Sequence, residues 1–253
     1  MEEKSYEYTE EEYQEAFEKV KRECIGQVQT KTNPKLIFAA GQPASGKSAL
    51  PKKIKKDYPN ISFVTVDMDK YRIYHPKIKK IEQDNADFVQ NTNNFSIRTE
   101  REMLEYCLRN RISFIHIGTM RIYEYLKQVV IDEAKKQGFD IEVYALAVPN
   151  EQSKISALLR EQEQRKTMEN FYRKTSENFI DEADEGFKRS IEIMSNSSDI
   201  SNIKVLIRGK TAEDLPILLY NQKIDRQGSY LNAYQALINI RQRQVNKNKK
   251  RNR

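Results

Sequence analysis

Residues 41–48 have the types and the spacing of a loop that binds phosphate groups. In chain order they are Gly41, Gln42, Pro43, Ala44, Ser45, Gly46, Lys47 and Ser48. They match every fixed position of the pattern G-x-x-x-x-G-K-[ST]. Glycines let backbone N–H groups curl round a phosphate, and the N-terminus of the following helix adds a partial positive charge. In such a loop Lys47 reaches the β- and γ-phosphates and Ser48 binds Mg²⁺, so the segment predicts binding of ATP with Mg²⁺.

Two carboxylates, Asp67 and Asp69, follow the apolar run 61–66. Residues two apart in an extended chain point the same way, and ligands of open α/β sheets bind at the carboxyl ends of the strands. A carboxylate at that place can accept the proton of a substrate hydroxyl during phosphoryl transfer, or hold Mg²⁺. The alternative is a pair of solvated turn aspartates. The nearby His75, taken alone, is best explained as a structural residue.

Apolar runs that would position these residues alternate with helical stretches. Strands are predicted at residues 36–40, 61–66, 112–117, 141–148 and 203–207. Helices are predicted at residues 10–29, 47–57, 99–110, 123–137, 151–168 and 175–195. Near-continuous apolar strands separated by helices are typical of a parallel sheet covered on both faces. We therefore expect an α/β fold, a P-loop NTPase or kinase-like three-layer sandwich with a mostly parallel central sheet and extra N- and C-terminal helices.

The chain divides by composition into one domain and a tail. Residues 1–240 are expected to form a single P-loop kinase domain, with the opening helix packed at the edge of the sheet and a polar loop at 91–94. Residues 241–253 are strongly basic and contribute to the net charge of +7. Such a tail can contact nucleic acid or a membrane surface, or it can be a solvated, frayed end. We favour the frayed end because the tail has no aromatic residue to stack on bases.

Composition excludes several classes of protein. Apolar residues make up 38% and charged residues 32% of the 253 residues. No apolar run approaches the roughly 20 residues of a membrane span, and no apolar segment of a signal peptide follows Met1. Cys24 and Cys107 are expected to be reduced thiols, and two histidines without a C-x-x-C pair argue against structural zinc. A cytoplasmic protein is expected.

The order of these groups resembles the zeta toxin family, the kinases of bacterial toxin–antitoxin systems, which are similar to P-loop sugar and antibiotic phosphotransferases. The resemblance rests on the P-loop with Gln42 and on the Asp-x-Asp pair, which is followed after five intervening residues by His75 and Pro76. It extends over about residues 36–208. The family phosphorylates the 3′-hydroxyl of UDP-N-acetylglucosamine with ATP, which blocks cell-wall synthesis. The resemblance implies that Asp69, the second carboxylate of the pair, is the general base.

The same resemblance implies that two arginines are catalytic, in addition to Lys47. Residues 147–149, Ala-Val-Pro, close the predicted fourth strand as they do in the family. Arg160 and Arg173 then follow at the spacing of the family's phosphate-binding arginines. A guanidinium has fixed donor geometry and stays charged, so it can bridge phosphate oxygens as charge moves in the transition state.

The chain departs from the family at the end of the third predicted strand. The family has Glu-Gly-Thr there, with the glutamate organising Mg²⁺ or its water, whereas this chain has Ile-Gly-Thr beginning at Ile117. An isoleucine cannot bind a metal ion, and strand alternation points the adjacent His116 to the opposite face. Three outcomes are open: Asp67 takes over this task, Mg²⁺ is held by Ser48 and the nucleotide alone, or activity is reduced.

Three residues are candidates for substrate binding. The resemblance implies a glutamate at the start of the helix before the third strand. Ungapped alignment places Arg101 there, between Glu100 and Glu102, and we choose Glu100. Thr119 keeps the family's residue, and Asp67 is the third candidate.

The expected function is that of an ATP-dependent phosphotransferase of the zeta toxin type, with a nucleotide-sugar substrate. The resemblance also implies a small helical antitoxin as partner; nucleic-acid binding and membrane contact are not expected. Two alternatives remain. One is a P-loop kinase of another hydroxyl, on a nucleic-acid end or an antibiotic. The other is a catalytically weak ATP-binding protein, because Ile117 replaces the family's glutamate.

Overall fold

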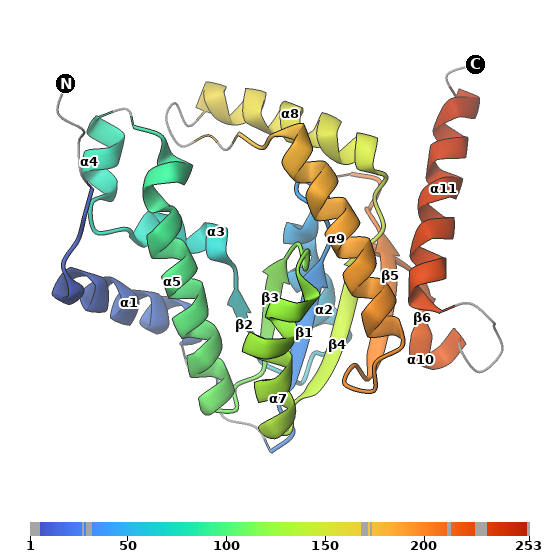
Figure 1. Cartoon of the computed structure of the whole chain (residues 1–253), viewed down its shortest axis with the longest axis horizontal. Coiled ribbons are helices and arrows are strands. Elements are labelled where there is room, and N and C mark those ends of the chain that lie inside the picture. Colours follow the sequence, from blue (N-terminus) through green and yellow to red (C-terminus); the bar gives the residue numbers. More distant parts are fainter. Residues whose placement is uncertain are drawn as a thin grey trace.

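The computed structural model describes residues 6–26, 28, 32–84, 86–167, 172, 174–211, 214–225 and 232–251. Its described part contains one six-stranded sheet of order β2-β3-β1-β4-β5-β6 (Figure 1). The strands are β1 (Lys35–Ala40), β2 (Val64–Val66), β3 (Phe114–Gly118), β4 (Asp140–Leu146), β5 (Asn202–Ile207) and β6 (Ile217–Asn221). The first five are parallel and β6 runs antiparallel to β5, so the prediction of a mostly parallel sheet is confirmed.

Helices precede, connect and follow the strands. The longer ones are α1 (Glu10–Ile25), α2 (Leu50–Asp57), α5 (Phe88–Arg109), α8 (Asn150–Thr167), α9 (Glu177–Ser195) and α11 (Ala233–Arg251). The short ones are α3 (Met68–Tyr71), α4 (Ile78–Gln83), α6 (Tyr123–Leu126), α7 (Asp132–Lys136) and α10 (Gln222–Asp225). Single turns of other helix types are η1 (Lys47–Ala49), η2 (Arg72–Tyr74) and η3 (Lys127–Ile131).

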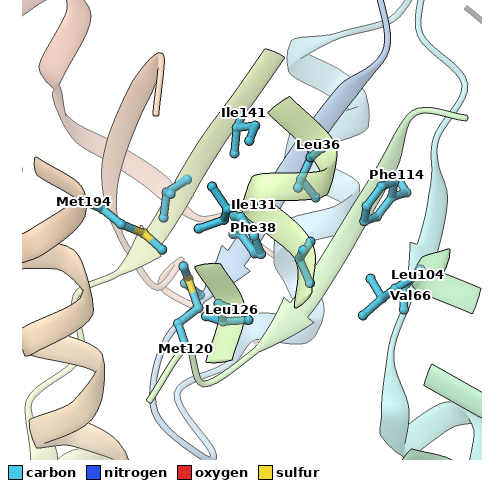
Figure 2. Close-up of a cluster of buried hydrophobic side chains, with 14 of the residues drawn as sticks. Leu36, Phe38, Val66, Leu104, Phe114, Met120, Leu126, Ile131, Ile141 and Met194 are labelled. Carbon is cyan, nitrogen blue, oxygen red and sulfur yellow. The ribbon is translucent and has the colours of Figure 1, made fainter. Parts of the chain in front are cut away.

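The central strand β1 is buried along its whole length and its side chains alternate between two cores. Leu36 and Phe38 face the larger core, which α1, α5, α6, α7, α9 and α11 cover. Figure 2 shows this core, with Phe114 of β3 and Met194 of α9 among its members. Ile37 faces the smaller core beneath α2. Helices therefore cover both faces of the sheet, as the apolar strands predict.

The predicted loop at residues 91–94 is wrong, because these residues lie inside α5. The side chain of Asp87 caps that helix by accepting a hydrogen bond from the backbone N–H of Gln90 at 2.7 Å. Thr92 is fully buried and accepts from the guanidinium of Arg72 at 3.2 Å. The polar run therefore has partners within the fold, which a polar surface loop would lack.

Two ends of the chain add elements to the sandwich. Helix α1 begins with a capping box between Thr9 and Glu12 and contacts the edge strand β2. Helix α11 continues without a break to Arg251, so the expected boundary at residue 241 cuts through it. Arg241 is only 7% exposed, so the expectation that it belongs to a frayed, solvated tail is wrong for this residue. Its guanidinium pairs with the buried carboxylate of Asp184 at 2.7 Å, which offsets the loss of water.

Strand β6 has no counterpart among the predicted strands. It lies at the edge of the sheet and exposes three apolar residues in a row, Ile217, Leu218 and Leu219. Alternation of apolar and polar residues, the usual signal of a half-buried strand, is absent there. Within the described residues, no helix has both the length and the apolar character needed to span a membrane.

Candidate functional site

The two glycines of the loop after β1 lie where a side chain would be unfavourable, each for its own reason. A Cβ on Gly41 would lie 2.8 Å from Oγ of Ser45, closer than carbon and oxygen approach without a bond. Gly46 has φ 88° and caps η1, in the left-handed region that glycine enters at little cost. The loop curls between them, with the amide of Ser45 donating to the carbonyl of Gln42 at 3.2 Å. The geometry is that of a strand, a tight turn and a helix start.

Lys47 and Ser48 lie at the start of η1, which leads into α2. The Lys47 ammonium donates to the carbonyl oxygen of Gln42 at 2.8 Å, so the half-buried side chain folds back over the loop. In P-loop proteins this amine reaches the β- and γ-phosphates. The Ser48 side chain is exposed. Both predicted phosphate-site side chains therefore lie at the accessible side of the loop.

Gln42 has a different setting from the rest of the predicted ATP site. It is fully buried, and its side-chain amide donates to the carbonyl of Val148 at 2.7 Å. Its amide oxygen accepts from a guanidinium N–H of Arg241, also at 2.7 Å. Both polar ends of this side chain are therefore held by protein, which anchors the loop to the end of β4 and to α11.

Arg208, which sequence reasoning missed, holds the loop from another side. It follows β5 directly and donates to the carbonyls of Ala44 and Ser45, the latter at 2.8 Å. A third N–H donates to the hydroxyl of Ser156 on α8 at 2.9 Å. Burial lowers the pKa of Arg208. Its position at the carboxyl end of a parallel strand is the one sequence signal that could have identified it.

The two aspartates after β2 lie in different environments. Asp67 caps α3 by accepting from the amide of Asp69 at 3.2 Å. Burial, and to a smaller extent the charge of Asp69, raises the pKa of Asp67. The Asp69 carboxylate instead lies 3.2 Å from Nε of Arg72 and is partly open to solvent. Of the pair, Asp69 therefore has both a fixed cation beside it and access to a ligand.

Arg72 ties this carboxylate to α5. It is 3% exposed and donates to the carbonyl of Val89 at 3.1 Å and to Oδ1 of Asn93 at 3.3 Å, besides its bond to Thr92. A guanidinium with donors in a rigid fork suits such a bridge. No local pattern marks Arg72 in the sequence, because its partners on α5 lie 17 to 21 residues away.

His75 is buried in an aromatic environment. Its ring lies edge-on to Tyr8 and Phe95, with centroids 5.2 and 5.3 Å away. Nδ1 accepts a hydrogen bond from the backbone N–H of Lys77 at 3.1 Å. Burial, followed by the charge of Lys77, lowers the pKa of His75 to about 4. These are the surroundings of a neutral, structural histidine.

Of the three neighbouring residues 100–102 on α5 considered for the family's glutamate, Glu100 is the one that faces the sheet. Its Oε1 lies 3.1 Å from Nε2 of His116 on β3, and its charge adds a minor upward contribution to the pKa of Asp67. Arg101 and Glu102 instead form ion pairs along α5, with Glu105 and Arg98 respectively. Thr119 is half-buried in the segment between β3 and α6.

Ile117 lies on the other face of β3, next to β1. It pairs in register with Ala39 and packs against the smaller core, whereas His116 packs near Phe38 on the opposite side. The expected divergence of His116 and Ile117 is therefore present. No group of three or more acidic, histidine or cysteine side chains that could hold a metal ion occurs in the described part of the chain. The exposed Ser48 hydroxyl fits a Mg²⁺ ion that takes most of its ligands from phosphates and water.

The two predicted phosphate-binding arginines belong to the region of α8. Arg160 lies on α8, half-buried, and its Nη2 donates to Oγ1 of Thr175 at 3.0 Å, just before α9. Arg173 lies outside the described residues.

Comparison with known proteins gives a family and a fold. The model of the zeta toxin family matches residues 18–224. No curated protein matches the chain significantly. A solved structure from the PezAT chromosomal toxin–antitoxin system of Streptococcus pneumoniae is similar with a TM-score of 0.73 and 18% identity, over 93% of this chain and 88% of that chain.

Two further solved structures come from the AvrRxo1-ORF1:AvrRxo1-ORF2 complex. The one with sulphate ions has a TM-score of 0.59 and 15% identity, over 90% of this chain and 72% of that chain. The one with ATP has a TM-score of 0.59 and 14% identity, over 84% of this chain and 66% of that chain. At these identities the likeness is one of fold.

Proposed function

The chain belongs to the zeta toxin family, and from that premise we propose that it transfers the γ-phosphoryl group of ATP to the 3′-hydroxyl of UDP-N-acetylglucosamine. The observation that carries the proposal is the shared edge of the sheet. The P-loop follows β1, the Asp67–Asp69 pair follows β2, and β3 with His116 and its partner Glu100 lies between those strands. A phosphate donor and an acceptor hydroxyl can meet there.

Asp69 is proposed as the general base. Its carboxylate accepts the proton of the attacking hydroxyl, whose oxygen forms the new bond to the γ-phosphorus while the bond from that phosphorus to the β-phosphate oxygen breaks. Arg72 holds this carboxylate in place through its contacts with α5. Because the protein takes little part in covalent chemistry, the fixed position of the base is its main contribution at this point.

The phosphate groups are assigned to the loop and to three cations. Backbone N–H groups of residues 41–48 and the start of the helix surround the phosphates, and Lys47 moves from the carbonyl of Gln42 to the β- and γ-phosphates. Arg160 and Arg173 are proposed to stabilise the moving charge. Ser48 would hold Mg²⁺, which supplies neutralisation of phosphate charge when bound.

The acceptor sugar is proposed to contact Glu100, Thr119 and Asp67. Asp67, with its raised pKa, lies close enough to Glu100 for the two charges to interact. Hydroxyl groups of a sugar can donate to such carboxylates. The proposal places the protein in the cytoplasm, where nucleotide sugars for cell-wall synthesis occur, and assigns it a small helical antitoxin as partner. Solved relatives of its fold come from a toxin–antitoxin system.

The proposal is tested by incubating the protein with ATP, Mg²⁺ and UDP-N-acetylglucosamine and following a phosphorylated sugar by mass spectrometry. Asp69→Asn is expected to lower the rate by roughly 10²- to 10⁴-fold, the usual contribution of a general base. Asp132→Asn, which changes a partly exposed carboxylate on α7 that pairs with Lys127, is the matched control. Absence of product from the wild-type protein, or full activity of Asp69→Asn, would refute the proposal.

One observation favours a second candidate, a nucleotide-binding protein with little turnover. Ile117 lies beside β1 in the smaller core, where the family has a glutamate that organises Mg²⁺. This candidate predicts ATP binding without transfer to any acceptor. Titration of the wild-type protein with ATP, in parallel with the transfer assay, separates the two candidates.

A further inference from the structure

The C-terminal helix α11 makes buried polar contacts with the P-loop. Arg241 lies on this helix and donates through Nη2 to the side-chain oxygen of Gln42 at 2.7 Å, across 199 positions of the chain. Both residues are buried: Gln42 has no exposed surface, and Arg241 is 7% exposed. One turn further along, Gln244 donates to the carbonyl of Ala147 at 2.8 Å. The helix therefore contacts both the loop and the end of β4.

A buried ion pair holds Arg241 in place. Its Nη1 donates to Oδ1 of Asp184 on α9 at 2.7 Å, and Lys188 lies 3.4 Å from the other oxygen of that carboxylate. Asp184 is only 3% exposed. A charge pair in this setting is costly to break, because the remaining charge would stay buried. The guanidinium thus has one end fixed by α9 and the other end aimed at Gln42.

Gln42 connects this arginine to the phosphate site. Its side chain is held at both ends, by Arg241 and by the carbonyl of Val148. Its own carbonyl accepts from the Ser45 amide, which closes the first turn of the loop, and from the Lys47 ammonium. Gln42 therefore joins the contact with α11 to the first turn of the loop and to the resting contact of Lys47.

We propose that Arg241 is a positioning residue for the P-loop, and that α11 is thereby part of the nucleotide site. The Nη1 atom of Arg241 pairs with the carboxylate of Asp184. Its Nη2 atom is thereby held in place to orient the side chain of Gln42. The ordering of the loop does not depend on which reaction the protein catalyses. The consequence for ATP rests on the proposed function.

The first test measures hydrogen exchange in the nucleotide-free, full-length protein. In Arg241→Met the Ser45 amide is expected to exchange at least about tenfold faster, as a locally opened segment does. Exchange in β4 and β5 is expected to stay unchanged. Arg243→Met removes an exposed arginine of the same helix and is the matched control. Unchanged exchange at Ser45, or an equal rise at every protected amide, would overturn the proposal.

A second variant covers the case in which Arg241→Met fails to fold. Arg241→Lys keeps a positive charge for Asp184, but one ammonium cannot reproduce two arms that reach two partners. This variant is expected to fold. The Ser45 amide should still exchange faster than in the wild-type protein, and the Kd for ATP should rise by about tenfold, which corresponds to 1.4 kcal/mol. Wild-type exchange and wild-type Kd in Arg241→Lys would show that Arg241 only stabilises the fold.

The two proposals fail in different ways. If the wild-type protein binds ATP but phosphorylates no sugar, the proposed reaction fails while the Kd values still report on Arg241. If it binds no ATP, the effect on the nucleotide is refuted, and the exchange of the Ser45 amide decides whether Arg241 orders the loop.

Discussion

Single residues at the carboxyl edge of the sheet differ in their chemistry because their surroundings differ. Asp67 and Asp69 are two positions apart, yet one caps a helix with a raised pKa and the other lies beside a fixed guanidinium. The two histidines of the chain also differ. His75 lies among aromatic rings, whereas His116 contacts the carboxylate of Glu100. Residue type alone does not separate these cases, and burial and partners do.

His75 should make the stability of the protein depend on pH. Its pKa is about 4 in the folded chain and 6.5 in the unfolded chain, so the unfolded state binds more protons between these values. The stabilisation is complete above pH 6.5 and is lost as the pH falls towards 4, with a limit of roughly 3 kcal/mol. Urea unfolding of wild type and His75→Phe at several pH values checks this. The free energy of unfolding of the variant should fall less steeply in this range; identical slopes would contradict the assignment.

Ile117 offers a gain-of-function prediction. Ile117→Glu places a carboxylate beside β1, where it can bind Mg²⁺ or its water, so kcat for phosphoryl transfer should rise about tenfold or more. The partly buried charge should also lower the free energy of unfolding by about 1–3 kcal/mol. Steady-state kinetics and denaturation measure the two effects. Ile117→Gln is the uncharged control, and an equal change in both variants would rule out a role for the carboxylate.

At the scale of elements, the site depends on contacts between segments that no single helix or strand contains. Helix α3 carries Asp69, but α5 supplies the carbonyl and side-chain acceptors that hold Arg72. The P-loop follows β1, but Arg208 after β5 and Arg241 of α11 hold its carbonyls and its Gln42 side chain. The loop and Asp69, the proposed base, are therefore each fixed from outside their own strand–helix unit.

Arg72→Met should uncouple Asp69, the proposed base, from α5. Because a displaced base lowers the chemical step, kcat should fall by roughly 10²-fold while the Kd for ATP stays within about twofold. Transfer kinetics and ATP titration measure the two quantities, and Arg72→Lys should recover part of the rate. Arg101→Met, which removes an exposed arginine of α5, should have no effect. A parallel loss of ATP binding in Arg72→Met would point to a general disruption of the fold instead.

At the scale of the whole molecule, α9 packs directly on the segment that follows β3. A Cβ on Gly186 would lie 2.2 Å from the carbonyl oxygen of Arg121, which is backbone and cannot move aside cheaply. The hydroxyl of Ser190, one turn later, donates to the carbonyl of Met120. This contact joins the helix layer to the segment that carries Thr119.

Gly186→Ala should therefore destabilise the protein by about 2 kcal/mol, although alanine is the better helix former. Thermal or urea denaturation measures the difference from wild type. Glu182→Ala changes an exposed residue one turn earlier on α9 and serves as the control, with an expected effect within about 0.5 kcal/mol. A stability of Gly186→Ala equal to that of the control would show that the segment after β3 yields without cost.

The sequence by itself determined the five parallel strands and the P-loop, because both depend on local rules. Successive side chains of a strand point to opposite faces, and the loop contains the two glycines that its turn needs, Gly41 beside Ser45 and Gly46 at φ 88°. The tertiary structure alone decided that residues 91–94 are helical, that β6 completes the sheet, and that Arg72, Arg208 and Arg241 hold the site. These side chains are defined by partners up to 199 positions away, and no local pattern encodes such a distance.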